Sequence, residues 1–243
     1  HPYTVTEQNF TIRQLQPRAD NRHAVFFTHA RETISYHYER NKNDPRMQHA
    51  LTLEVDQFGN VLKEAAIGYG RRAGKSPLQG EDKDKQEQLL ITYTENGFTR
   101  DDATHSLTNP ELSPHNHRTP LLCETQTYEI TGLKLEQEQL RFSFDQMLEG
   151  VQSAQRIDYH QTPSDSLQKR VVEHARTLYR RNDLTGALAL GELQSLALPF
   201  ERYQLAFTPE HLDLVFGDRI NDAILSNEGR YVHSENDTNW WIP

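Results

Sequence analysis

Histidine is the residue type that most invites a chemical role, because the chain carries 12 histidines in 243 residues. Three of them, His105, His115 and His117, lie close together in the sequence and could supply imidazole ligands to zinc. They fall in a proline-rich stretch, without cysteine partners and without the helical i, i+4 spacing of a convincing zinc site. We therefore interpret them as part of a polar loop, and the sequence predicts no metal and no cofactor.

A second group of ligand-type side chains, Asp56 and Asn60, flanks Gly59 in the stretch Asp-Gln-Phe-Gly-Asn. Calcium takes six to eight oxygen ligands, more than this short stretch offers. Glycine reaches a positive φ without steric cost, and Asp and Asn side chains bond to the backbone of turns. The three residues therefore predict a structural turn that closes a β-hairpin.

The single cysteine, Cys123, follows Leu121 and Leu122, which favours a buried small hydrophobe over a nucleophile. A GxSxG elbow, a phosphate-binding loop, an HExxH motif and a dinucleotide-binding fingerprint do not occur in the sequence. We therefore assign no catalytic residue and expect a protein that is not an enzyme.

Composition narrows the classes of partner. The formal net charge is −9, and lysine and arginine are scattered along the sequence instead of gathered in the basic stripe typical of nucleic-acid-binding proteins. We therefore expect no nucleic-acid partner. Hydrophobic residues make up 35% of the chain and mean hydropathy is −0.82, yet 10 Phe and 10 Tyr favour a folded chain with much wetted surface. With no apolar run near the roughly 18 residues that cross a bilayer, we expect no direct membrane insertion.

Apolar residues recur at every second position in several stretches, which predicts strands. Four such stretches occupy the first third of the chain, at 10–12, 24–28, 34–38 and 51–55. The predicted hairpin continues into 61–69, and further strands are expected at 89–93, 121–130 and 231–233.

Helix signals are fewer. Ser143 and Gln146 form a capping-box pattern that predicts a short helix over 144–152. Thr208 as N-cap, Pro209 at the first helical position and Gly217 as the stop predict another helix, with a second over 218–225. The stretch 169–180 fits a strand and an amphipathic helix equally well.

The predicted fold class is mainly β: an antiparallel sheet with a few short α-helices. We expect residues 1–243 to form one fragment of a larger β shell and interpret both ends of the sequence as cuts. Its predicted parts are a β meander with the hairpin (1–70), polar loops around one strand (71–120), further strands with a short helix (121–205), short helices (206–228) and a terminal strand (229–243).

Four long stretches carry a family resemblance: HAVFFTHARETISYHYER at 23–40, LTLEVDQFGNVLKEAAIGYGRR at 51–72, LYRRNDLTGALALGELQSLALPFERYQLAFTPE at 178–210 and GRYVHSENDTNWWIP at 229–243. Through them the chain resembles the B component of bacterial insecticidal toxin complexes, in the region that follows its β-propeller. VDQFGNV also resembles one turn of the Rhs or YD repeat, in which such turns punctuate the hairpins of a spiralling sheet.

This resemblance implies a secreted, non-catalytic part of a container. In that family the B and C components form a closed β shell around the toxic C-terminal part of the C component, and the B propeller docks on the pore-forming A component. The implied partners are therefore the Rhs-repeat C component and, through the parent protein, the A component.

Relatives of this family include precursors of mono-ADP-ribosyltransferases, whose paired catalytic glutamates resemble Glu136 and Glu138. The Ser-Thr-Ser strand and the arginine that such enzymes place upstream are not evident. In a chain with 35 acidic residues a Glu-x-Glu pattern is expected by chance. We therefore interpret the pair as coincidental.

A different class of function is a carbohydrate- or receptor-binding β domain, which would present aromatic side chains for stacking. Its candidates are the strand Ile34 to Tyr38 and the pair Trp240 and Trp241. In the shell hypothesis the two indoles are interface residues that pack against sequence outside this chain. That hypothesis predicts solvent-exposed indoles in the isolated chain.

Overall fold

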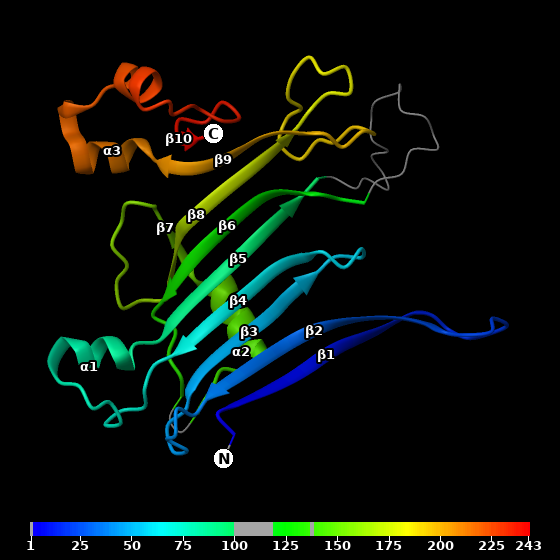
Figure 1. Cartoon of the computed structure of the whole chain (residues 1–243), viewed down its shortest axis with the longest axis vertical. Helices are drawn as coiled ribbons and strands as arrows, with labels where there is room; N and C mark the ends of the chain where they lie inside the picture. The colour runs from blue at the N-terminus through cyan, green and yellow to red at the C-terminus, as the bar shows by residue number, and fades with distance from the viewer. Residues whose placement is uncertain (1, 100–118, 137–138) are drawn as a thin grey trace. The chain divides into compact units, whose positions relative to one another are not determined.

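A computed structural model describes residues 2–99, 119–136 and 139–243 (Figure 1). The strands are β1 (Thr4–Gln16), β2 (Val25–His37), β3 (Arg46–Val55), β4 (Val61–Tyr69), β5 (Leu90–Phe98), β6 (Leu122–Thr131), β7 (Gln155–Ile157), β8 (Gln168–Tyr179), β9 (Pro199–Phe207) and β10 (Trp240–Ile242). The helices are α1 (Gly80–Glu87), α2 (Phe144–Ser153) and α3 (Pro209–Phe216), with a 3-10 turn, η1 (Gly217–Arg219), and a π turn, η2 (Ile224–Glu228). The predicted fold class, mainly antiparallel β with a few short helices, is confirmed.

The chain divides into two compact units, each built from separate stretches of sequence. Unit 1 comprises His1–Tyr93, Glu129–Gln155 and Ser164–Gln168, and unit 2 comprises Thr94–Tyr128, Arg156–Pro163 and Lys169–Pro243. The strands β5 and β6 contribute residues to both units. The units therefore interleave along the sequence, whereas the parts predicted from the sequence follow one another.

Unit 1 is an antiparallel meander in which β1, β2, β3 and β4 pair in sequence order. The stretches 24–28 and 34–38 were predicted as separate strands, but both belong to β2, which runs unbroken for 13 residues. The intervening residues stay extended because β2 pairs with β1 over its whole length and with β3 from Glu32 onward. Backbone pairing thus holds a polar segment in the sheet where side-chain alternation gives no signal.

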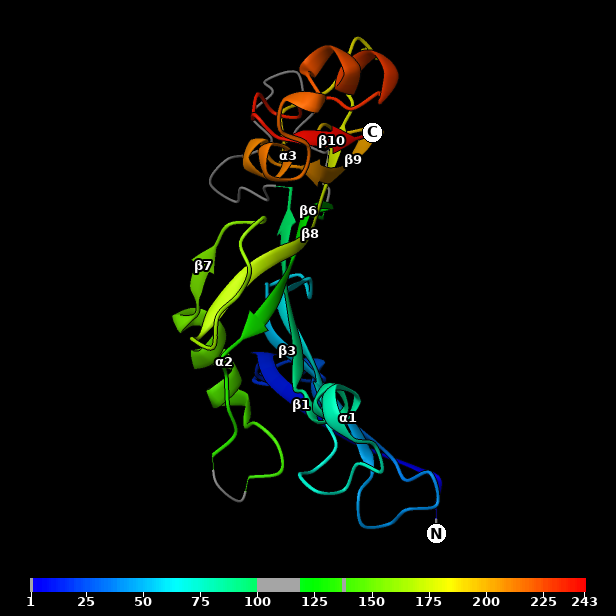
Figure 2. The same ribbon diagram turned by 90° about the vertical axis from the view of Figure 1, so that its left-hand side faces the viewer.

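One face of the unit 1 strands is covered by α2 (Figure 2). The predicted capping box is present: the Ser143 side chain accepts from the Gln146 N–H, and the Gln146 side chain accepts from the Ser143 N–H. Met147 and Val151 of this helix are buried, as are the apolar residues that alternate along the strands, among them Leu51 and Ile67. The period-two pattern of the sequence therefore marks the side of the strands that faces the core.

Unit 2 has two apolar clusters. One contains Cys123, Tyr179, Leu188 and Leu193, and the other contains Leu178, Tyr203 and Trp241. The stretch 169–180, which the sequence left open between helix and strand, is the strand β8, paired antiparallel with β9. Its buried residues fall on both faces, which explains why a single period did not emerge from the sequence.

Three predictions for the polar and C-terminal stretches need correction. The stretch predicted as a solvated loop contains the exposed helix α1. Glu81 and Asp82 in its first turn and Lys85 in its last turn stabilise this helix, because their charges oppose those of the helix dipole at each end. The helix predicted over 209–216 is confirmed as α3, but the second helix, over 218–225, is replaced by η1 and η2. Residues 231–233 form only an isolated bridge, from Val232 to Trp241.

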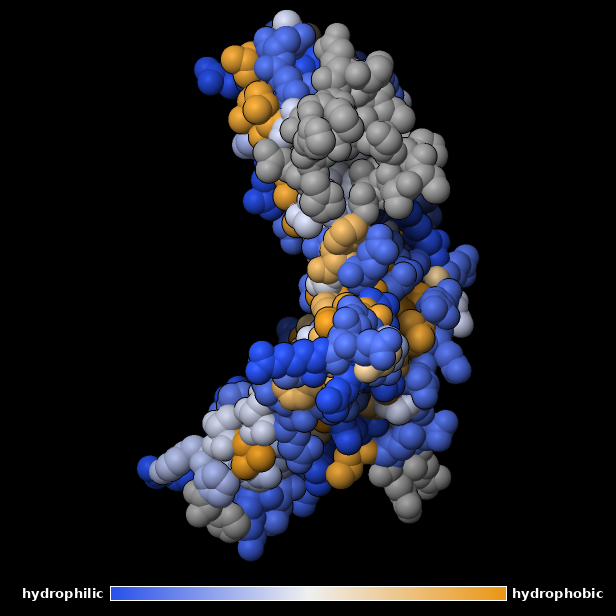
Figure 3. All heavy atoms as spheres, turned by 90° about the vertical axis from the view of Figure 1, so that its right-hand side faces the viewer, coloured by the Kyte–Doolittle hydropathy of each residue, from blue (hydrophilic) through white to orange (hydrophobic). Residues whose placement is uncertain are grey.

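Large apolar side chains are also exposed in both units, including Phe10, Ile12 and Phe26 on the β1–β2 hairpin. On the face drawn in Figure 3, hydrophilic residues cover most of the described surface and apolar residues form scattered patches. This distribution agrees with the low mean hydropathy of the sequence.

Candidate functional site

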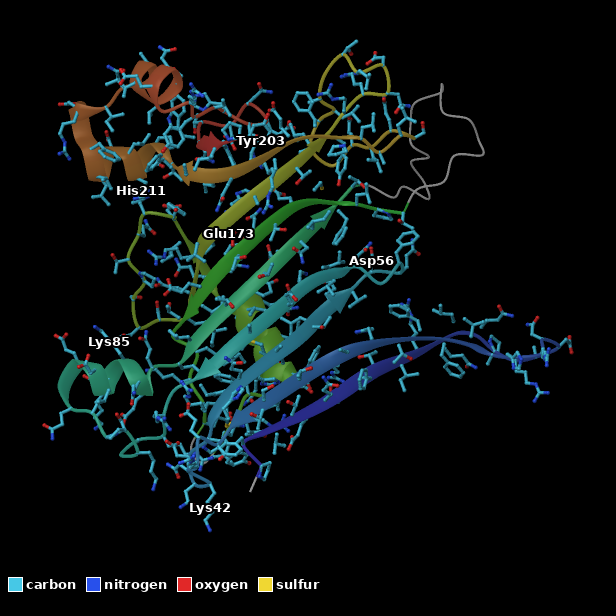
Figure 4. All side chains as sticks on the ribbon, viewed as in Figure 1. Lys42, Asp56, Lys85, Glu173, Tyr203 and His211 are labelled. Carbon is cyan, nitrogen blue, oxygen red and sulfur yellow. The ribbon has the colours of Figure 1, made fainter. Side chains whose placement is uncertain are left out.

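The predicted turn residues Asp56, Gly59 and Asn60 lie in the connection between β3 and β4 (Figure 4 labels Asp56). Asp56 Oδ1 accepts from the N–H groups of Phe58 and Asn60, each at 2.8 Å, and Oδ2 accepts from Asn60 Nδ2 at 2.9 Å. Gly59 has a φ of 93°, and a Cβ there would lie 3.2 Å from the Phe27 ring. The carboxylate is thus occupied by local donors, and the geometry is that of a structural turn.

The two indoles at the C-terminal end are not exposed. Trp241 is 0% exposed and Trp240 is 6% exposed. Trp241 packs in the apolar cluster with Leu178 and Tyr203, and Trp240 contacts His233 with ring centroids 4.1 Å apart and ring planes tilted by 40°. The expectation of solvent-exposed indoles is therefore wrong, because unit 2 itself supplies the packing partners.

A partly buried polar network surrounds Trp241 in unit 2. Arg176 on β8 donates from Nε to Glu124 Oε1 at 3.2 Å and from Nη1 to Asp237 Oδ2 at 2.8 Å. The other oxygen of Asp237 accepts from Trp241 Nε1 at 3.0 Å. His174 Nε2 donates to Glu124 Oε1 at 2.7 Å.

Aromatic contacts complete this network. The Arg176 guanidinium carbon lies 4.3 Å from the centre of the Trp241 ring, in the range of a cation–π contact. The His174 ring meets the same indole edge-on at 4.9 Å. Because Asp237 belongs to the C-terminal segment and Arg176 to β8, the network fastens that segment to a central strand of unit 2.

The electrostatics favour the ionised form of Glu124. The hydrogen bond from His174 lowers the pKa of this carboxyl; burial opposes that shift, and the hydrogen bond from Arg176 adds to it. A carboxylate can orient a histidine as a general base, but here Glu124 is shared with Arg176 and the His174 ring packs against the Trp241 indole. Ser234, which is 3% exposed, contributes its carbonyl to Arg176, and its Oγ has no partner among the described residues. The arrangement is therefore that of a structural clamp.

Unit 1 contains a smaller polar site around His49, which is 1% exposed. His49 Nδ1 lies 3.2 Å from the Tyr69 hydroxyl, and Nε2 lies 3.3 Å from Glu32 Oε1. The Tyr69 hydroxyl accepts from the Phe142 N–H at 3.0 Å, which connects β4 to the chain just before α2. Burial lowers the pKa of His49 despite the nearby Glu32, and burial raises the pKa of Tyr69 to about 12.

Of the remaining residues that the sequence singles out, Cys123 and Glu136 are described by the structure. Cys123 is buried, and burial raises the pKa of its thiol to about 11. Glu136 is exposed, whereas Glu138 lies outside the described residues, as do the three histidines of the proposed zinc reading. In the described part of the chain, no group of three or more His, Cys, Asp or Glu side chains could hold a metal ion. None of the helices described there is long and apolar enough to cross a bilayer.

Sequence reasoning missed the network around Trp241. Its only sequence signal was the alternation of His174, Arg176 and Leu178, which places these three side chains on one face of β8 if that stretch is a strand. Glu124 and Asp237 are 50 or more residues away in the sequence from the β8 side chains that they bind. No local pattern could have joined them.

Comparison with known proteins relates part of the chain to a family. Residues 1–109 match the family model described as "Insecticide toxin TcdB middle/C-terminal region". Over these residues, the family model bears out the resemblance to the B component of insecticidal toxin complexes. A search of curated proteins found no match.

Solved structures of this type share the fold of the chain. The crystal structure of TcdB2–TccC3 matches with 24% identity and a TM-score of 0.66, and the same complex without the hypervariable C-terminal region matches with 24% identity and a TM-score of 0.63. The Tc holotoxin pore of Photorhabdus luminescens matches with 22% identity and a TM-score of 0.60. Each match covers 99% of this chain and 11% of the other chain. The chain therefore spans about a tenth of the length of the chains that it matches.

Proposed function

We propose that this chain is a non-catalytic structural module of a secreted insecticidal toxin complex. In this role it forms part of the β shell that the B and C components build around the toxic C-terminal part of the C component. The observation that carries the proposal is the match of 99% of the chain to TcdB2–TccC3 complexes. The proposed direct partner is the Rhs-repeat C component, and the parent protein supplies the link to the A component.

The face of unit 1 opposite the core suits the wall of a container. A shallow hollow of about 410 Å³ crosses it, lined mainly by small or uncharged polar residues that include Thr33, Ser35, Gln48, Ala50 and Ala66. These residues are paired across neighbouring strands, Thr33 with Ala50 and Ala50 with Ala66. The lining contains no Asp, Glu, Lys or Arg, and Leu90 is its one large apolar side chain that is exposed. Such a lining gives an unfolded chain little to bind, as enclosure without retention requires.

The proposal is testable in the full-length B component bound to its C component. Trp241→Ala removes the centre of the clamp in unit 2 and should open the shell locally, so that protease digests the enclosed part of the C component faster. Lys85→Ala, in the exposed helix α1, is the control and should leave protection unchanged. Equal protease resistance in both variants, provided that both still bind the C component, would contradict a wall role for this module.

The alternative is a carbohydrate- or receptor-binding domain built on the predicted aromatic residues. Both indoles are buried and Ile34 is 2% exposed, so these groups present no stacking surface. Tyr36 and Tyr38 are partly exposed and stack on each other with ring centroids 6.5 Å apart, so this hypothesis rests on the two tyrosines alone. The absence of catalysis is part of the proposal. NAD-dependent labelling of a protein substrate that disappears in Glu136→Ala plus Glu138→Ala would overturn it.

A further inference from the structure

A groove of about 550 Å³ in unit 2 lies between α3, the turns that follow it and the C-terminal segment. Figures 1 and 2 both show α3 next to β9 and β10. The apolar lining includes Leu212 and Phe216 from α3, Ile220 and Leu225 from the turns, and Trp240 from β10. The groove and the clamp around Trp241 are separate features that share one residue: Asp237 lines the groove and also accepts from Trp241 Nε1 in the clamp.

The groove is held open by packing on its outer sides. Thr208 caps α3 by accepting from the His211 N–H at 3.3 Å. Phe207, at the end of β9, contacts the rings of His211, Phe216 and Tyr231 with centroids 5.5 to 6.0 Å apart. The helix α3 is therefore anchored by its N-cap and by Phe207, yet none of its residues is buried in the described chain. An anchored but uncovered apolar wall is typical of a preformed binding surface.

Charge at the groove is one-sided. Asp213, on α3, and Asp222, before η2, are exposed and line the groove, and neither carboxylate is paired with a cation in the described part of the chain. Among the described residues that line it, none is lysine or arginine. Residues 208–229 carry five carboxylates and one arginine, Arg219, which donates to the carbonyls of Phe216 and Val215 at the end of α3. The local field therefore favours a cationic partner.

We propose that this groove binds a polypeptide segment that places apolar side chains against Ile220 and Leu212 and lysine or arginine beside Asp213 and Asp222. The apolar lining supplies the contact area, and the two carboxylates supply orientation and discrimination against acidic segments. The shape and the charge of the groove carry this inference. It does not depend on the shell role, because a basic, apolar segment could belong to any partner of the chain.

A random-sequence peptide array probed with the whole chain tests the chemical class of the occupant. We expect bound peptides to be enriched in lysine or arginine next to leucine, phenylalanine or tryptophan. The best of these peptides is then measured in solution by fluorescence anisotropy. Its affinity should fall as ionic strength rises, because the exposed carboxylates are screened by salt.

Variants locate the bound peptide. Asp213→Asn plus Asp222→Asn should weaken binding about fivefold, the effect of losing two exposed ion pairs. Ile220→Ser, in the groove, should weaken it about tenfold or more, the scale of one buried aliphatic side chain. Leu214→Ser is the matched control: this side chain is on α3, is 69% exposed and does not line the groove. It should leave affinity unchanged.

Several results would overturn the proposal. They are an array without enrichment of basic, apolar peptides, binding that survives both groove variants, and binding that Leu214→Ser weakens as much as Ile220→Ser. A glycan that binds the chain and is displaced by no peptide, with loss of binding in Ile220→Ser, would assign the groove to a sugar instead. Circular dichroism of each variant separates loss of contact from loss of fold.

Discussion

Replacing Arg176 with a neutral side chain of similar length should strongly lower the stability of unit 2. Its side chain is 14% exposed and bridges two carboxylates that are each 25% exposed, Glu124 and Asp237. The variant Arg176→Met keeps most of the aliphatic stem but leaves both carboxylates without their shared cation. It also removes the guanidinium from the face of Trp241.

The magnitude follows from these contacts. Removing one partner of a buried ion pair costs about 3 to 5 kcal/mol, because the remaining charge stays desolvated. Both carboxylates here keep partial access to water, and Glu124 retains its bond from His174, so the lower end applies. We expect Arg176→Met to lower the free energy of unfolding by about 3 kcal/mol, on the order of 150-fold in the folding equilibrium.

Urea unfolding of the chain, followed by tryptophan fluorescence and by circular dichroism, measures this loss. Arg202→Met is the control, because Arg202 is exposed on β9 and pairs in register with Thr177. It should change the free energy of unfolding by less than about 0.5 kcal/mol. If Arg176→Met costs under about 1 kcal/mol, or no more than the control, the clamp does not stabilise the C-terminal segment and the reasoning fails.

The same network predicts that the stability of the folded chain falls at acidic pH. The pKa of Glu124 is lower in the folded chain than its ordinary value of 4.5, so its contribution is fully present above that pH and is lost as pH falls through the folded pKa. Wild type should therefore lose more stability than Arg176→Met on acidification below about pH 4.5. Equal losses in the two proteins would show that the Arg176–Glu124 contact carries no net stabilisation.

Two further predictions concern unit 1. Gly59→Val should lower the melting temperature more than Gly59→Asn, because a β-branched residue is strained at a φ of 93° and Asn tolerates positive φ better; equal melting temperatures would contradict this. The pKa of His49 is lowered by burial, so as pH falls below about 6.5 the unfolded chain takes up the proton first and stability declines. His49→Gln should flatten that decline in urea titrations near pH 6, whereas the exposed His23→Gln should not.

Much of the fold could be predicted where the deciding interactions are local. The turn after β3 and the caps of α2 and α3 depend on residues within a few positions of one another, and the sequence shows them all. β8 was different, because its strand state is settled by pairing with residues of β9 that lie 20 to 29 positions later. The polar middle of β2 is likewise held by its two neighbours. Strand pairing of this kind joins residues far apart in the sequence, so no short stretch of sequence reveals it.

The two tryptophans show how a long-range interaction can reverse a local expectation. Adjacent residues of a strand point to opposite faces, so burying both indoles requires cover on both sides of β10. Trp241 faces the clamp, through Asp237 and Arg176, while Trp240 faces His233 and the groove. A ligand in the groove would therefore contact the same short strand that the clamp fixes. In the variant Trp241→Phe, Trp240 is the single tryptophan of the chain, so its fluorescence emission reports directly whether the groove is occupied.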